Sequence, residues 1–204
     1  EIYEAKDNEV FEIGDIKLKL LHTPGHTMES SSLLLIDANG KDHAIFTGDT
    51  LFVGDVGRPD LAVKSDLSQD DLAALLFNSI QTKIKTLDDS VIVYPGHGAG
   101  SACGKNIGTE LTSTIGAQKK TNYALQIEDE IKFVQAVTDG LTAPPSYFFH
   151  DAMMNKMGYD PIDKVIQEKS NALSIDEFLK AKNNGAVILD ARHQDEFEKG
   201  FING

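Results

Sequence analysis

The sequence predicts an α+β fold in which helices cover a β-sheet. Three observations support this prediction. The first half of the chain alternates short apolar segments with turns rich in Gly, Pro, Asn and Asp, whereas the second half spaces its apolar residues as helices do. Residues 91–94 are wholly apolar, which is typical of a strand buried inside a layered fold.

The strands are predicted from period-two alternation and from the turns between them. Two strands flank a Gly14-Asp15 turn and form a hairpin; the second alternates apolar with basic residues, which indicates one solvent-facing side. The strands predicted in this part of the chain are 10–13, 16–20, 31–36, 43–47 and 91–94.

The helices are predicted from start signals and from helical spacing. Ser68 is a candidate N-cap followed by acidic residues, and it starts a helix that extends to residue 87. One buried face of that helix carries Leu72, Leu75, Leu76, Ile80 and Ile84. Ser174 is a second candidate N-cap. Further helices are predicted at 110–120 and 128–137.

We predict two domains, residues 1–170 and residues 171–204. The segment 146–158 is too apolar for a free linker, so we expect it to cover the first domain. The second domain starts with the Ser174 helix and a strand at 187–190, and it is too short to bury a core of its own.

Composition limits the partners and the location of the protein. The 204 residues include 32 acidic and 19 basic ones, and the net charge of -13 repels nucleic acid and anionic membranes. No apolar run approaches the ~18 residues of a membrane span, and the N-terminus lacks the features of a signal peptide. Cys103 is the only cysteine, which agrees with a reducing compartment. A cytoplasmic location is therefore expected.

Three residues that can bind a metal each follow an apolar strand and a glycine turn. They are His26 in HTPGHT, Asp49 in TGDTLF and His97 in PGHG. Taken singly, His26 is explained as a turn residue that hydrogen-bonds the backbone, and Asp49 as a solvated turn carboxylate. Their shared pattern instead predicts a metal site, provided that the three strands lie in one sheet.

Three further residues are candidates for catalysis. Arg58 could bind a substrate carboxylate through two parallel hydrogen bonds, or it could pair with a nearby Asp and rigidify its loop. Tyr94 could donate a hydrogen bond into the site, or it could be a core aromatic. Cys103, in the Gly-rich loop after His97, could carry sulfur or position a substrate, or it could be an inert buried thiol.

Four motifs together resemble the metallo-β-lactamase superfamily. They are HTPGHT at 22–27, TGDTLF at 47–52, GRPD at 57–60 and PGHG at 95–98. The resemblance covers residues 1–150 and implies the second half of an αββα sandwich. It also implies that His26 and Asp49 are metal ligands, and that His97 either lies next to the metal without binding it or binds a second metal.

Within this superfamily the sequence is similar to the persulfide dioxygenases fused to rhodanese domains. GRPDL at 57–61 resembles the dioxygenase loop more than the GRFFEG loop of glyoxalase II. GAGSACGKN at 98–106 resembles the fused forms, and residues 189–204 resemble the opening of an α/β rhodanese-like domain.

The resemblance implies an Fe(II) enzyme that oxidises a small thiol persulfide, of glutathione or a similar carrier, with O2 to sulfite. Two His and one carboxylate on an octahedral ion leave three positions open, which suits this reaction. The other His of the family belongs to an HxHxDH motif, which is absent from these residues and is expected ahead of residue 1. We therefore expect the 204 residues alone to be inactive.

Two other functions are kept open. The first is a zinc-dependent thioester hydrolase of the glyoxalase II type, in which two metals activate a water. The second is a non-catalytic scaffold that keeps the fold without the metal. A homo-oligomer is also open, because the sequence does not determine the oligomeric state.

Overall fold

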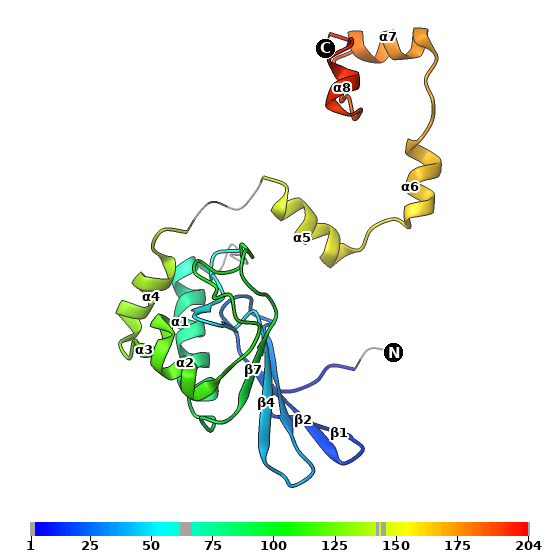
Figure 1. Cartoon of the computed structure of the whole chain (residues 1–204). Helices are drawn as coiled ribbons and strands as arrows, with labels where there is room; N and C mark the ends of the chain where they lie inside the picture. The colour runs from blue at the N-terminus through cyan, green and yellow to red at the C-terminus, as the bar shows by residue number, and fades with distance from the viewer. Residues whose placement is uncertain (1–2, 62–66, 142, 144–145, 204) are drawn as a thin grey trace. The chain divides into compact units, whose positions relative to one another are not determined.

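The fold was analysed in a computed structural model of the chain, which describes residues 3–61, 67–141, 143 and 146–203. The chain divides into two compact units, 1–144 and 145–204 (Figure 1). The division falls ahead of the domain boundary predicted at 170/171. Helices at 148–157 and 162–169 belong to the second unit, and the helix at 162–169 has no buried residue.

A six-stranded mixed sheet forms the centre of the first unit. Its order is β1-β2-β3-β4-β7-β8; all neighbouring pairs are antiparallel except β4 and β7, which are parallel. The strands are β1 (Val10–Ile13), β2 (Ile16–His22), β3 (Ser31–Ile36), β4 (Asp42–Gly48), β7 (Ile92–Pro95) and β8 (Ser113–Thr114). A separate antiparallel pair joins β5 (Leu51–Phe52) and β6 (Asp55–Val56). The predicted strands are confirmed to within a few residues at their ends.

The two faces of this sheet differ in burial. Leu21, Leu34, Ile45 and Val93 belong to the buried core and lie on one face. On the other face, Leu20, Leu33, Phe46 and Tyr94 are register partners in a row across four strands. Phe46 and Tyr94 stack on each other and remain 43% and 41% exposed. In the described part of the first unit, only one face of the six-stranded sheet is buried and the β5–β6 pair is separate, whereas the resemblance implies a four-layer αββα sandwich.

Helices α1 to α4 lie on the same side of the sheet (Figure 1). They are α1 (Gln69–Ser79), its π-helical continuation η1 (Ile80–Ile84), α2 (Ile115–Thr121), α3 (Tyr123–Gln126) and α4 (Glu130–Thr138). Ser68 and Asp71 form a reciprocal capping box that starts α1. Phe77 of α1 packs against Phe133 of α4, with ring centroids 5.3 Å apart. The predicted start of α1 is confirmed, and of its predicted buried face only Leu75 is not fully buried. The last turn is a π-helix.

The second unit is helical in the part that the structure describes. Its helices are α5 (Phe148–Met157), α6 (Ile162–Lys169), α7 (Ile175–Asn183) and α8 (Gln194–Phe197). Ser174 caps α7 through a second capping box with Glu177, as predicted. The strand predicted at 187–190 is not formed, because residues 146–203 contain no strand with which it could pair. Val187 and Leu189 are correspondingly exposed. The rhodanese-like assignment stays a prediction.

Among the described residues, no helix combines the length and the apolar character needed to cross a membrane.

Candidate metal centre

The parallel strands β4 and β7 bring two of the predicted ligands together. Because parallel strands end at the same edge of a sheet, Asp49 after β4 and His97 after β7 lie side by side. The amide of Gly96 donates to the carbonyl oxygen of Gly48 at 2.8 Å and joins the two turns directly. The sheet topology therefore explains a contact between residues that are far apart in the sequence.

Two glycines let the backbone approach Asp49 closely. A Cβ atom on Gly57 would lie 1.9 Å from the carbonyl oxygen of Asp49, and one on Gly96 would lie 2.7 Å from its Oδ1 atom. Neither distance is compatible with a side chain, so the site requires glycine at both positions. Glycine beside a strand end was the sequence signal for such an approach.

His26 is held in one orientation by the loop that contains the GRPD sequence. Its Nδ1 atom lies 2.8 Å from the carbonyl oxygen of Arg58, which can only accept, so Nδ1 carries the proton and donates. The Nε2 atom, which carries the lone pair in the neutral ring, lies 3.4 Å from Oδ2 of Asp49. The side chain of His26 is only 10% exposed. This is the usual arrangement of a metal-binding histidine whose second nitrogen is fixed by a carbonyl.

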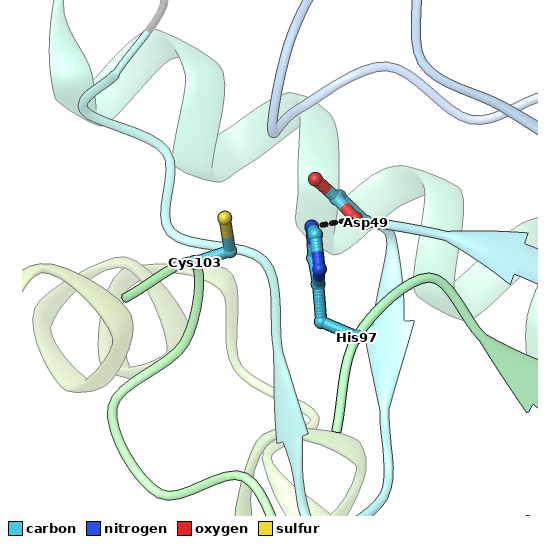
Figure 2. A group of neighbouring side chains, drawn as sticks. All are labelled: Asp49, His97 and Cys103. Carbon is cyan, nitrogen blue, oxygen red and sulfur yellow. Dashed lines mark ion pairs between the residues drawn. The ribbon is translucent and has the colours of Figure 1, made fainter. Parts of the chain in front are cut away.

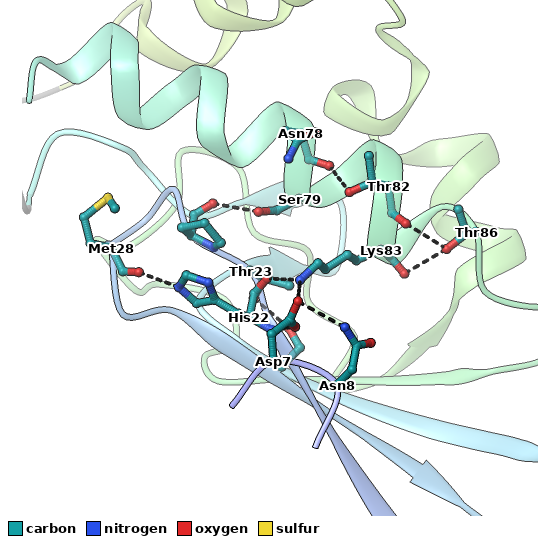
Figure 3. A network of polar contacts seen from close by, with 12 residues as sticks. Asp7, Asn8, His22, Thr23, Met28, Asn78, Ser79, Thr82, Lys83 and Thr86 are labelled. Atoms are coloured by element: carbon teal, nitrogen blue, oxygen red, sulfur yellow. Dashed lines mark hydrogen bonds and ion pairs between the residues drawn. The ribbon is translucent and has the colours of Figure 1, made fainter. Parts of the chain in front are cut away.

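The backbone around His26 is fastened to α1 and η1 (Figure 3). Ser79 Oγ donates to the carbonyl oxygen of Pro24 at 2.8 Å. Lys83 Nζ donates to the carbonyl oxygen of His22 and to Oδ2 of Asp7, each at 2.7 Å. The ring of His22 contacts the carbonyl oxygen of Met28 at 2.7 Å and spans the loop. His22 is thus a structural hydrogen-bonding residue.

His97 approaches the other oxygen of Asp49. Its Nε2 atom lies 3.3 Å from Oδ1, and its ring packs beside Phe52 with centroids 6.0 Å apart. Both His–Asp separations exceed a typical N–H···O hydrogen bond of about 2.9 Å. They match the distance of about 3.4 Å that is expected between two ligand atoms of a tetrahedrally coordinated ion with bonds of about 2.1 Å. One carboxylate oxygen faces each histidine, so Asp49 is placed to bind one ion or to bridge two.

Cys103 joins this group. One ligand atom each from Asp49, His97 and Cys103 lies within 4.8 Å of the others. Figure 2 shows the ring of His97 between the Asp49 carboxylate and the Cys103 sulfur, with the three residues on three separate segments. The sequence predicted Cys103 near the pocket, but it did not indicate that the sulfur approaches two candidate ligands. Among the described residues, the close group is therefore one imidazole, one carboxylate and one thiol, and His26 adds a second imidazole at the other oxygen of Asp49. Such ligands fit a borderline divalent metal.

Arg58 takes the structural alternative of the two that the sequence left open. Its Nε and Nη2 atoms donate to the two carboxylate oxygens of Asp60, each at 2.6 Å, and the side chain is buried. These hydrogen bonds raise the pKa of Arg58, so the guanidinium stays charged. Its Nη1 atom also donates to the carbonyl oxygen of Ala102 at 3.3 Å. Arg58 thereby links the loop after β6 to the loop that contains Cys103.

Tyr94 is not the core aromatic that one of the two alternatives predicted. Its ring lies on the uncovered face of the sheet and stacks on Phe46, with centroids 5.4 Å apart and the side chain partly exposed. Residues alternate between the faces of a strand, so Val93 points into the core and Tyr94 points away from it.

Asp55 is a buried residue with a structural role that the sequence analysis did not identify. It is 1% exposed, and its Oδ2 atom accepts from the amide of Asn106 at 2.6 Å. Its other carboxylate oxygen accepts from the amide of Val56 at 2.8 Å. Burial, together with Asp55, raises the pKa of Tyr123. The only signal in the sequence was an Asp that follows Gly54 in a glycine-rich loop, which is a common pattern for an exposed turn.

Comparison with known proteins identifies the fold family. Residues 2–97 match the sequence profile of the metallo-beta-lactamase superfamily. This part of the chain forms a metallo-beta-lactamase superfamily domain. It contains His26, Asp49 and His97, so the three candidate ligands lie inside the matched region.

Two solved structures resemble the chain in sequence and fold. A metallo-beta-lactamase from Staphylococcus aureus is 40% identical with a TM-score of 0.69, over 78% of this chain and 45% of that protein. ETHE1 from Myxococcus xanthus is 25% identical with a TM-score of 0.58, over 76% of this chain and 60% of that protein.

A hydroxyacylglutathione hydrolase from Dictyostelium discoideum is also similar to the chain. It is 28% identical over 154 residues, which are 74% of this chain and 52% of that protein. The chain spans about half the length of the curated relatives that it matches.

Proposed function

We propose that these residues supply part of the metal centre of a non-haem iron persulfide dioxygenase. The reaction consumes a thiol persulfide, O2 and water and yields the thiol, sulfite and two protons. Glutathione or a similar small thiol is the proposed carrier, and the proposed location is the cytoplasm. The GRPD loop carries the proposal, because the carbonyl oxygen of Arg58 in this loop orients the His26 ring toward Asp49.

The chain's own residues would bind and orient the metal. His26 Nε2 and Asp49 Oδ2 face each other at 3.4 Å and would bind from one side, and His97 lies at the opposite oxygen. Gly57 and Gly96 keep the surrounding backbone close enough to hold the carboxylate in place. When bound, iron would supply the Lewis-acid and redox chemistry for oxidising the substrate sulfur. The similarity to ETHE1 from Myxococcus xanthus supports this choice.

The test uses the native protein in which these 204 residues occur. Oxygen uptake and sulfite formation are measured with glutathione persulfide, and bound metal is determined by elemental analysis. We expect one oxygen consumed per sulfite formed, with bound iron. His26→Ala should abolish turnover, and His193→Ala, an exposed histidine in the second unit, should not change it. Bound iron without oxygen uptake would contradict the proposal.

A zinc-dependent thioester hydrolase of the glyoxalase II type is the second candidate. The observation that favours it is the orientation of the Asp49 carboxylate, whose Oδ2 atom faces His26 and whose Oδ1 atom faces His97. A carboxylate that bridges two metal ions has the same arrangement. The similarity to a hydroxyacylglutathione hydrolase points the same way. Two zinc ions per chain, turnover of S-lactoylglutathione and no oxygen uptake would establish this function in place of the dioxygenase.

A further inference from the structure

The backbone around Cys103 is fastened to the loops of the metal centre. The amide of Arg58 donates to the carbonyl oxygen of Cys103 at 3.0 Å, and Nη1 of Arg58 donates to that of Ala102 at 3.3 Å. The amide of Cys103 donates to Oγ of Ser101 at 3.1 Å. The carbonyl oxygen of Arg58 also contacts Nδ1 of His26. Arg58 therefore fixes the positions of both His26 and Cys103.

The part of this loop that follows Cys103 is held by the buried carboxylate of Asp55 and by the backbone of Val53. The amide of Asn106 donates to Oδ2 of Asp55 at 2.6 Å, and the amide of Gly108 donates to the carbonyl oxygen of Val53 at 2.7 Å. A Cβ atom on Gly104 would lie 2.9 Å from Oδ2 of Asp55, so the chain is tightly packed directly after Cys103. The thiol is therefore presented by an ordered loop with several fixed points.

The sulfur lies within reach of two ligand atoms that can share an ion. The ligand atoms of Asp49, His97 and Cys103 are all within 4.8 Å of one another. Ligands of a tetrahedral ion with one bond of about 2.3 Å to sulfur are separated by about 3.6 Å. The side chain of His97 is 43% exposed, so its ring has room for the small movement that closes the set. His26, which is nearly buried, faces the same carboxylate from the other oxygen.

We propose that Cys103 is a metal ligand, which together with Asp49 and His97 binds a borderline divalent ion such as Zn²⁺ or Fe²⁺. A thiolate, an imidazole and a carboxylate form a mixed soft and hard set that suits such ions. The thiol releases its proton to solvent when the sulfur–metal bond forms. The ion lies on the Oδ1 side of Asp49, where His97 approaches. This inference rests on the proposed metal centre and not on the reaction proposed for it.

The test titrates the 204-residue chain with Co²⁺ as a spectroscopic substitute. Because Cys103 is the only cysteine in the chain, any thiolate-to-cobalt charge-transfer band must come from it. We expect this near-ultraviolet band to appear on titration. Cys103→Ser should lose the band and keep visible d–d absorption, and His97→Ala should weaken the band. His43→Ala, an exposed histidine outside the centre, is the matched control and should leave the spectrum unchanged.

A second measurement needs no variant. The rate at which iodoacetamide alkylates Cys103 is measured with and without Zn²⁺. We expect Zn²⁺ to slow alkylation by at least about tenfold, because a sulfur bound to the metal must dissociate before it reacts. Co²⁺ binding without a charge-transfer band, or equal alkylation rates with and without Zn²⁺, would overturn the proposal. Neither the charge-transfer band nor the alkylation rate depends on oxygen uptake. Failure of the dioxygenase proposal is therefore distinguished from failure of the Cys103 proposal.

Discussion

The two units of the chain contain similar local structure but differ in how it is stabilised. Each has a helix that begins with a complete capping box, Ser68–Asp71 in the first unit and Ser174–Glu177 in the second. The helix of the first unit buries an apolar face in a common core, whereas α7 has no buried residue. Local start signals therefore define a helix in both units, but only the first unit has the core that can support a metal centre.

The largest expected difference between the units concerns core packing. Leu76→Ala removes a fully buried side chain that packs on the His26 loop at Gly25, and it should lower the free energy of unfolding by about 2–5 kcal/mol. Leu179→Ala in α7, where the leucine is 46% exposed, should change it by less than about 0.5 kcal/mol. Hydrogen exchange resolved by residue measures each unit separately. Equal effects would show that the second unit also depends on a core.

The second largest difference between the units is expected in the stability that each gains on metal binding. At a free Zn²⁺ concentration 100 times its dissociation constant, the first unit should gain about 2.7 kcal/mol, and a chelator should reverse the gain. The second unit contains none of the candidate ligands and should gain nothing. Protection of α4 and α7 amides from exchange is the measurement, and Asp49→Ala, which removes the carboxylate that His26 and His97 both face, should remove the effect. An equal gain in α7 would contradict a site confined to the first unit.

A smaller effect is expected from the glycines at the metal edge. Gly57→Ala places a Cβ atom against the carbonyl oxygen of Asp49, and it should cost about 1–3 kcal/mol as an overpacked site does. Gly98→Ala is the matched control, because the nearest atom to its Cβ is Leu111 Cδ2 at 3.8 Å. Urea unfolding measures stability, and Co²⁺ titration measures the site. If both variants behave alike, the close approach at Gly57 is unimportant.

The smallest expected effect concerns the two capping boxes. Ser68→Ala should reduce the stability of the first unit by about 1 kcal/mol, and Ser174→Ala should only lower the local helicity of α7. Circular dichroism and urea unfolding distinguish these results. A change in first-unit stability caused by Ser174→Ala would show that the two units unfold together.

The stability that the two capping boxes contribute should depend on pH. Hydrogen bonds from Ser68 and Ser174 lower the pKa values of Asp71 and Glu177 below their ordinary values of 3.8 and 4.5. A lowered carboxyl pKa stabilises the folded state above the ordinary pKa, and this contribution is lost as the pH falls through the lowered value. The differences between wild type and the two Ala variants should therefore shrink in acid. A difference that grows below pH 3.8 would contradict the capping role of Asp71.

Much of the first unit could be predicted, because its signals are local. Alternation and turn residues located the strands, and Ser68 located the start of α1. The convergence of His26, Asp49 and His97 was predictable because each follows a strand end, and the parallel pairing of β4 with β7 makes two of these ends meet.

The remaining features depend on tertiary contacts that no local pattern reports. Arg58 pairs with Asp60 because the folded loop places the two side chains together, and the sequence left its partner open. Cys103 approaches His97 because distant backbone bonds shape its loop. The strand predicted at 187–190 had the right composition, but a strand also needs a neighbour, and residues 146–203 provide none.

The π-helical turn at the end of α1 sets the rotational phase of the residues in it. In η1, the amide of Lys85 donates to the carbonyl oxygen of Ile80 at 2.9 Å, five residues back, so the turn holds one more residue than an α-helix would. Deleting one residue between Ile80 and Lys83 would rotate Lys83 by about 100° around the axis, away from His22 and Asp7. The buried side chain of Ile84 would rotate with it. The length of this turn is therefore as constrained as the identity of the metal-binding residues, even though η1 contains none of them.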